Sequence, residues 1–163
     1  MNSLQKLFAY NEWAWQQVLN SAAKLDAAEY KKEGPYFWGS IHSTLVHSLF
    51  AEFAWHARLT GVSPTSIFQP ADFPDVAAVR ARWAEVNAAL RAYVDNLEES
   101  DLARPITYRN TRGEEFAVAA GDILRHVANH ATEHRSQLTP ALYNLGAPTP
   151  PLDYMRFCLT VAA

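Results

Sequence analysis

The sequence predicts an all-α fold, built as a four-helix bundle around one core. Four long segments carry apolar residues at the spacings of amphipathic helices, and little of the chain shows the alternation typical of strands. The 163 residues are 49% hydrophobic and 19% charged, which is typical of a globular domain of this length. We therefore expect residues 1–163 to form a single helical domain.

The first two predicted helices cover residues 3–24 and 41–60. Ser3 and Ser40 stand where N-caps are expected, and Gly61 follows the second helix, where glycine is common. The apolar positions are Leu4, Leu7, Phe8, Trp15, Val18, Leu19 and Ala22 in the first helix, and Ile41, Leu45, Leu49, Phe53 and Trp55 in the second.

The third and fourth predicted helices cover residues 75–98 and about 122–144, and Asp75 is a suitable N-cap for the third. The loop at 61–74 is long enough for the second and third helices to be neighbours without being antiparallel. Simple up-down-up-down order therefore does not follow from the pattern. The apolar stripe of the third helix consists of Val76, Val79, Trp83, Val86, Leu90, Val94 and Leu97.

Two shorter elements complete the predicted fold. Two β-leaning runs on either side of "RNTRGEE" predict a small hairpin before the fourth helix. Leu145-Gly146 ends the fourth helix, and "APTPPLDY" leads into a short C-terminal helix at about 151–161.

Charge and cysteine content narrow the functional classes. The formal charge is −3 and no run of Lys or Arg stands out, so nucleic acid is not an expected partner. The single cysteine, Cys158, excludes an internal disulfide, and we expect a packed thiol in a reducing compartment. No segment approaches the ~20 apolar residues of a membrane-spanning helix, and the N-terminus lacks a signal-peptide core. The expectation is a cytoplasmic protein without a membrane partner.

Three histidines follow one another at four-residue intervals in "DILRHVANHATEHRSQL", residues 122–138. Side chains four apart share one face of a helix, so His130 and His134 could bind one metal ion, or could simply be packed and hydrogen-bonded. Their H-A-T-E-H sequence lacks the Glu that directly follows the first histidine in zinc proteases. A protease is therefore not favoured.

A third imidazole comes from the second predicted helix. His47 lies in an apolar segment, where the alternatives are a hydrogen-bonded core histidine and an inward-facing ligand. One histidine from this helix and the pair His130 and His134 would make a three-nitrogen set with coordination positions left open for water or substrate. We predict that this trio binds a divalent metal ion.

The remaining histidines are expected outside the trio. His126 lies a further turn before His130 and is interpreted as a core residue or as a support behind the ligands. His56 follows His47 by nine residues, about 180° around the helix, so it should face the surface or an interface. His42 is offset from His47 by about 140° and is also left out.

Other polar and aromatic residues could support the site. Glu52 and Glu133 could each orient a histidine, although exposed ion pairs are the more common use of such carboxylates. Arg135 and Gln137 are expected to form hydrogen bonds at the end of the bundle. Four aromatic residues could line a pocket above the metal but are more typical of a core: Tyr10, Trp13, Trp15 and Trp38.

The chain resembles the DinB/YfiT-like superfamily. The resemblance lies in "YNEWAW", "SIHSTLVHSLFAEFAW", "HVANHATEHRSQL" and "LGAPTPPLDY", which follow the family order over nearly the whole chain. The most specific motif is H-x-x-x-H-R-x-Q-L, which is matched by His130, His134, Arg135, Gln137 and Leu138.

The resemblance implies a bundle of up-down-down-up order, often dimeric, with a metal triad at His47, His130 and His134. Nickel, zinc and iron are the metals associated with the family. Its members include transferases that use the thiols mycothiol or bacillithiol, a maleylpyruvate isomerase and hydrolase-like proteins. Members commonly have Asn in place of Trp15 and Gly in place of Ser136, and neither departure removes a ligand.

We therefore expect a homodimeric, metal-dependent enzyme that transfers or activates a low-molecular-weight thiol on a small electrophile. A metal-dependent hydrolase is an alternative, because water and thiol chemistry would use the same three ligands. A non-catalytic bundle, in which the histidines are structural and an apolar surface mediates dimerisation or partner binding, is the other alternative.

Overall fold

The computed structural model describes residues 2–34 and 38–161, and the chain is mostly helical there. The predicted all-α class and the predicted hairpin are confirmed. The elements are the helices α1 (Ser3–Ala22), α2 (Ala27–Lys31), α3 (Ile41–Leu59), α4 (Val76–Asp95), α5 (Ala120–Asn144) and α6 (Tyr154–Val161), the strands β1 (Pro105–Arg109) and β2 (Glu115–Ala119), and the 3₁₀ turns η1 (Pro70–Asp72) and η2 (Glu99–Ala103).

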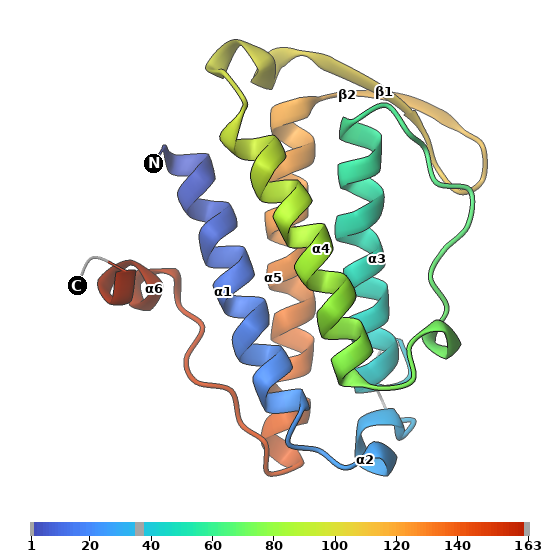
Figure 1. The fold of residues 1–163 in the computed structure, drawn as a ribbon, viewed down its shortest axis with the longest axis vertical. Helices are drawn as coiled ribbons and strands as arrows, with labels where there is room; N and C mark the ends of the chain where they lie inside the picture. Colours follow the sequence, from blue (N-terminus) through green and yellow to red (C-terminus); the bar gives the residue numbers. More distant parts are fainter. Residues whose placement is uncertain (1, 35–37, 162–163) are drawn as a thin grey trace.

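Four long helices form the bundle, in which α1 lies beside α4 and α5, and α3 lies beside the same two helices. Arg80, near the start of α4, donates a hydrogen bond to Asn20, near the end of α1, so these helices are antiparallel. In Figure 1, α1 and α5 run from top to bottom, whereas α3 and α4 run from bottom to top. The four directions therefore follow the order down-up-up-down.

The connection between α3 and α4 makes this order possible. It leaves the end of α3 at one end of the bundle and returns along the side, through η1, to the start of α4 at the other end (Figure 1). A short turn would instead have made α3 and α4 antiparallel.

The starts of α1, α3 and α4 are set by side-chain caps. Ser40 and Asp75 cap α3 and α4 as predicted. The N-cap of α1 is Asn2 and not Ser3, because Asn2 and Gln5 exchange two hydrogen bonds between side chain and backbone. Such a reciprocal pair needs Gln or Glu three residues after the cap, and Ser3 has a lysine there.

Several boundaries and one helix differ from the prediction. The short helix α2 was missed because five residues are too few for a periodic pattern, although Asp26 and Glu29 form a capping box at its start. The first helix ends at Ala22 and α4 ends at Asp95, each a few residues early. The helix α6 begins at Tyr154, after the prolines of the preceding loop, which have no N–H to donate.

The hairpin and α6 lie outside the four long helices (Figure 1). The strands β1 and β2 pair antiparallel from Pro105↔Ala119 to Arg109↔Glu115 and lie across the end of the bundle where α5 begins. The helix α6 packs outside α1, where the ring of Phe157 contacts Tyr10 and Trp13. Cys158 belongs to the same outer cluster as a half-buried free thiol.

The main core lies between the four long helices. Trp15 and Trp83 are completely buried at its centre, with ring centroids 4.4 Å apart. Along the described part of the chain, no helix combines the length and the apolar character that crossing a membrane requires.

Candidate metal centre

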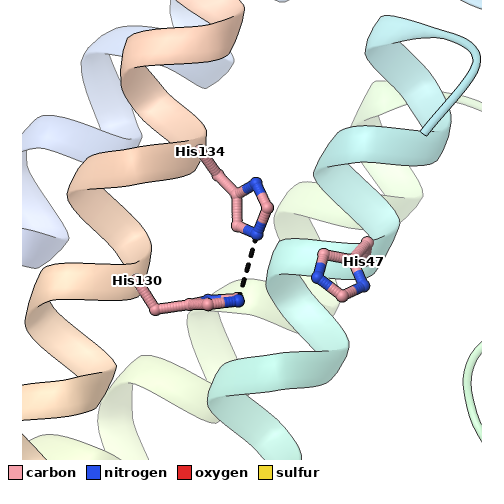
Figure 2. A group of neighbouring side chains, drawn as sticks. All are labelled: His47, His130 and His134. Carbon is pink, nitrogen blue, oxygen red and sulfur yellow. Dashed lines mark hydrogen bonds between the residues drawn. The ribbon is translucent and has the colours of Figure 1, made fainter. Parts of the chain in front are cut away.

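Three imidazoles from two neighbouring helices meet inside the bundle. Figure 2 shows His130 and His134 projecting from α5 toward α3, where His47 lies opposite them. Each residue offers one ring nitrogen, and these three atoms all lie within 4.8 Å of one another. His134 is buried and the other two are half-buried. The structure thus brings together the trio that sequence spacing predicted.

The tautomer of His134 is set by its neighbour on α5. The Nδ1 of His134 lies 2.8 Å from the Oε1 of Gln137, an acceptor, so Nδ1 carries a proton and, in the neutral ring, Nε2 carries a lone pair. That lone pair faces the Nε2 of His130, which is 3.1 Å away (Figure 2). Metal sites typically contain a residue that accepts a hydrogen bond from the second ring nitrogen of a ligating imidazole and so orients the ring. Gln137 is therefore a positioning residue and not, as predicted, a group at the end of the bundle.

The trio fits a divalent metal ion. Two nitrogens bound to the same tetrahedral zinc ion are about 3.4 Å apart, since each Zn–N bond is about 2.1 Å. The 3.1 Å between the Nε2 atoms of His130 and His134 is close to that spacing. The nitrogen of His47 is also near enough for a small ring rotation to complete the set. Imidazole nitrogens suit zinc, nickel, copper and iron.

The protonation of His47 and His130 also favours metal binding. Burial, together with the neighbouring imidazoles of His134 and His130, lowers the pKa of His47 to about 4. Burial is also the main cause that lowers the pKa of His130 to about 4, where His134 and His126 act in the same direction and Glu133 acts in the opposite one. At neutral pH both rings are therefore uncharged, which is the form that binds metal.

An apolar cavity of about 520 Å³ opens beside His47. Trp38 stacks on the imidazole of His47, with ring centroids 3.8 Å apart and an angle of 19° between the planes. Trp38 is 39% exposed, so it lies at the mouth of the site and not in the core. The cavity is lined by Trp38, Ser43, Val46, His47, Phe50, Arg58, Ile67, Phe68, Gln69, Pro70 and Thr111.

The other histidines lie outside the trio. His126 is exposed, so the predicted core position is wrong; its ring lies against Trp55 and His130, and the alternative of a support behind the ligands stays a prediction. His42 is buried and its Nε2 bonds to the carbonyl of Pro70. His56 is half-buried and packs against Tyr93.

Glu52 has a role that the sequence did not predict. It is 2% exposed and accepts hydrogen bonds from the side-chain N–H groups of Asn11, Trp15 and Trp83, at 2.8, 2.9 and 2.8 Å. Burial raises the pKa of Glu52, while these donors and the charge of Arg135 act in the opposite direction. All three partners are donors, so the ionised carboxylate, which only accepts, satisfies every bond. Glu52 is therefore neither a support of the histidines nor an exposed ion-pair partner.

Arg135 completes this network and is also not at the end of the bundle. Its side chain is 2% exposed and donates to the Oδ1 of Asn11 at 2.6 Å and to Thr132 at 2.9 Å. The sequence did carry a signal for this burial. Arg135 occupies one position of a stripe with alternating spacings of four and three, in which every member is buried: Leu124, Ala128, Ala131, Arg135, Leu138 and Leu142.

The remaining candidates separate into core and surface. Trp15 belongs to the core and does not line the cavity at the trio. Tyr10 and Trp13 pack against α6. Glu133 is exposed, and so is Ser136, whose hydroxyl donates to the carbonyl of Thr132.

The chain is similar to known proteins over most of its length. The sequence model of the DinB family matches residues 1–160. The chain is 23% identical to Protein DinB of Bacillus subtilis (strain 168) over 156 residues, which span 91% of this chain and 90% of that protein. It also resembles a crystal structure of a conserved protein from Enterococcus faecalis, with a TM-score of 0.67 and 15% identity, over 87% of this chain and 96% of the other. Because the family match spans nearly every residue, the chain belongs to the DinB family.

Proposed function

We propose that the protein is a metal-dependent enzyme in which His47, His130 and His134 hold a divalent metal ion. One observation carries the proposal: three imidazole nitrogens from two helices lie within 4.8 Å of one another. Two of the rings have pKa values of about 4 and are neutral at physiological pH. Membership of the DinB family supports the same assignment.

Thiol transfer to a small electrophile is the reaction we favour. When bound by three imidazoles, a divalent metal supplies a site that lowers the pKa of a coordinated thiol or water. The protein contributes the orientation of His134 through Gln137 and an apolar cavity beside His47. Hydrolysis would use the same ligands, so we keep it as the second candidate.

Metal analysis tests the first part of the proposal. The protein is purified without a histidine tag and reconstituted separately with nickel, zinc and iron(II). We expect about one equivalent of one of these metals per chain after removal of free ion. A content below about 0.2 equivalents with all three metals would remove the basis for an enzyme.

Turnover assays test the second part. The metal-loaded protein is offered an electrophile with a bacillithiol-like or mycothiol-like thiol, and in parallel an ester or amide without thiol. Consumption of the thiol supports transfer, whereas metal-dependent release of acid without thiol supports hydrolysis. The competing hypothesis of a purely structural trio predicts no metal-dependent turnover and no stabilisation by metal.

We also propose that the protein is a homodimer, as the family resemblance implies. On the described part of α6, Met155 and Leu159 lie one turn apart and are 65% and 71% exposed. Such apolar side chains on one face are suited to contact with a second copy. Light scattering during size-exclusion chromatography should give twice the chain mass of 18.3 kDa, and Leu159→Lys tests the role of α6.

A further inference from the structure

The cavity beside His47 contains a buried positive charge that the chain itself does not neutralise. Two arginines are buried in the described structure, Arg58 and Arg135, at 8% and 2% exposure. Arg135 donates hydrogen bonds to Asn11 and Thr132. For Arg58, by contrast, the described residues provide neither a hydrogen bond nor an ion pair, and its buried Nε has no partner.

Two aromatic rings hold Arg58 in place. Its guanidinium carbon lies 4.5 Å from the ring centroid of Trp55 and 4.9 Å from that of Tyr108. Such cation–π contacts stabilise the charge, but they use the faces of the guanidinium and leave its N–H edges free. Leaving a buried charged donor without a hydrogen-bond partner is unfavourable. The arrangement therefore favours an external acceptor for these N–H groups.

The position of Arg58 relates it to the metal trio. It follows His47 by eleven residues on α3, which is about 20° around the helix and about 16 Å along it. A helical side chain leans toward the N-terminus of its helix, so Arg58 leans back toward His47. Both residues line the same cavity of about 520 Å³, a volume typical of small-molecule sites.

We propose that Arg58 binds the carboxylate of an elongated, partly apolar substrate whose reacting group lies beside His47. This inference rests on the proposed function, because it names the substrate class of the same site. Planar guanidinium groups bind carboxylates through two parallel hydrogen bonds. The apolar part of the molecule would contact Val46, Phe50 and Phe68, which line the same cavity.

Binding to the metal-free protein tests this inference separately from the metal. The probes are ω-phenylalkanoates, from 3-phenylpropanoate to 6-phenylhexanoate, each paired with its neutral primary amide. Their dissociation constants are measured by calorimetry near neutral pH after removal of metal. We expect at least one acid to bind about tenfold or more tightly than its amide, as a charge-assisted hydrogen bond predicts.

Variants assign the preference for the acid to one residue. In Arg58→Met the ratio between amide and acid dissociation constants should fall to about one, and Arg58→Lys should keep part of it. The matched control is Arg82→Met, which removes a guanidinium that lies over Phe53 and Phe68 but does not line the cavity. Circular dichroism checks folding, and the comparison of acid and amide on the unaltered protein remains decisive if Arg58→Met unfolds.

A second pair of probes identifies which reactant carries the carboxylate. N-acetylcysteine and its amide represent the thiol, whereas the phenylalkanoates represent the electrophile. A dependence on Arg58 in only one pair assigns the carboxylate to that reactant. Equal binding of acid and amide in both pairs, or no binding up to about 10 mM, overturns the inference. A metal-loaded protein with these results would still leave the proposed metal function intact.

Discussion

Two polar clusters lie inside this bundle, about one and a half helical turns apart on α3, and they differ in how their hydrogen-bonding capacity is used. The Glu52 cluster joins all four long helices, and each of its carboxylate oxygens accepts from a buried N–H group. The histidine trio joins only two helices and lies beside a cavity. The trio contains one internal hydrogen bond, between His130 and His134. Some of the other ring nitrogens of the trio have no hydrogen-bond partner in the described structure.

The difference separates a structural cluster from a candidate functional one. A buried polar group whose partners are all supplied by the chain stabilises one arrangement of the helices, and no capacity remains for a ligand. Imidazoles that are neutral, preoriented and next to open volume retain that capacity. Removal of a residue should therefore affect folding in the first cluster and metal binding in the second.

The largest expected effect is on folding. Glu52→Leu leaves three buried N–H donors and Arg135 without their carboxylate, which should lower the free energy of unfolding by about 3–5 kcal/mol. Urea denaturation measures it. The control is Glu85→Ala, which breaks an exposed ion pair with Arg82 and should cost about 0.5 kcal/mol or less. Similar losses in both variants would contradict a structural role for the network.

The next effect concerns stabilisation by metal. Zinc at one hundred times its dissociation constant should raise the free energy of unfolding of the unaltered protein by about 2.7 kcal/mol. His130→Ala should lose this increment, because only two of the three imidazole ligands remain. His56→Ala should retain it, because His56 lies outside the trio. Thermal denaturation with zinc and with a chelator measures the increment. An increment unchanged in His130→Ala would separate metal binding from the trio.

A smaller effect is expected from the residue that orients a ligand. Gln137→Leu removes the acceptor for the Nδ1–H of His134 and should weaken zinc binding about 10–100-fold. Competition with a chromogenic chelator gives the dissociation constant. Ser136→Ala is a matched control on the adjacent position, since its hydroxyl bonds only to the backbone of its own helix. Equal affinities in the two variants would show that the orientation of His134 does not depend on Gln137.

The smallest effect is a dependence on pH in the metal-free protein. His47 and His130 have folded-state pKa values of about 4, against an ordinary value of 6.5. The unfolded chain therefore binds more protons between these values, and the free energy of unfolding should fall as the pH falls from 6.5 toward 4. Above pH 6.5 the two residues should not make the free energy of unfolding depend on pH.

A double variant isolates this contribution. Between neutral pH and about pH 5.5 the unaltered protein should lose free energy of unfolding. Replacing both histidines by Gln should reduce this loss by about 1 kcal/mol, after allowance for the partial exposure of the rings. Urea denaturation at several pH values measures it. Parallel pH profiles for the variant and the unaltered protein would mean that the rings are as easily protonated in the folded state as in the unfolded one.

Much of the fold could be predicted from local pattern. The apolar spacings placed the four long helices to within a few residues, and the caps Ser40 and Asp75 were read correctly. The short helix α2 and the capping box at Asn2 were missed, because a single turn gives no periodicity and because reciprocal caps depend on the residue three positions later.

The candidate site was predictable for a related reason. His130 and His134 lie on one face of any helix that contains them, so their proximity follows from the helix alone. The approach of His47 depends on α3 lying against α5, and sequence spacing could only suggest it. The directions of α3 and α4 likewise depended on the path of a loop whose length permitted either order.

The amino-acid pattern alone thus determined where helices form, which face of each is apolar and which histidines share a turn, since these are properties of neighbours along the chain. Only the tertiary structure decided the roles of polar residues at apolar positions. Arg135 and Arg58 are both buried arginines, yet one donates to an acceptor on a helix more than a hundred residues away and the other faces a cavity. Such partners come from other helices, and their distance depends on how the helices pack and not on any local spacing.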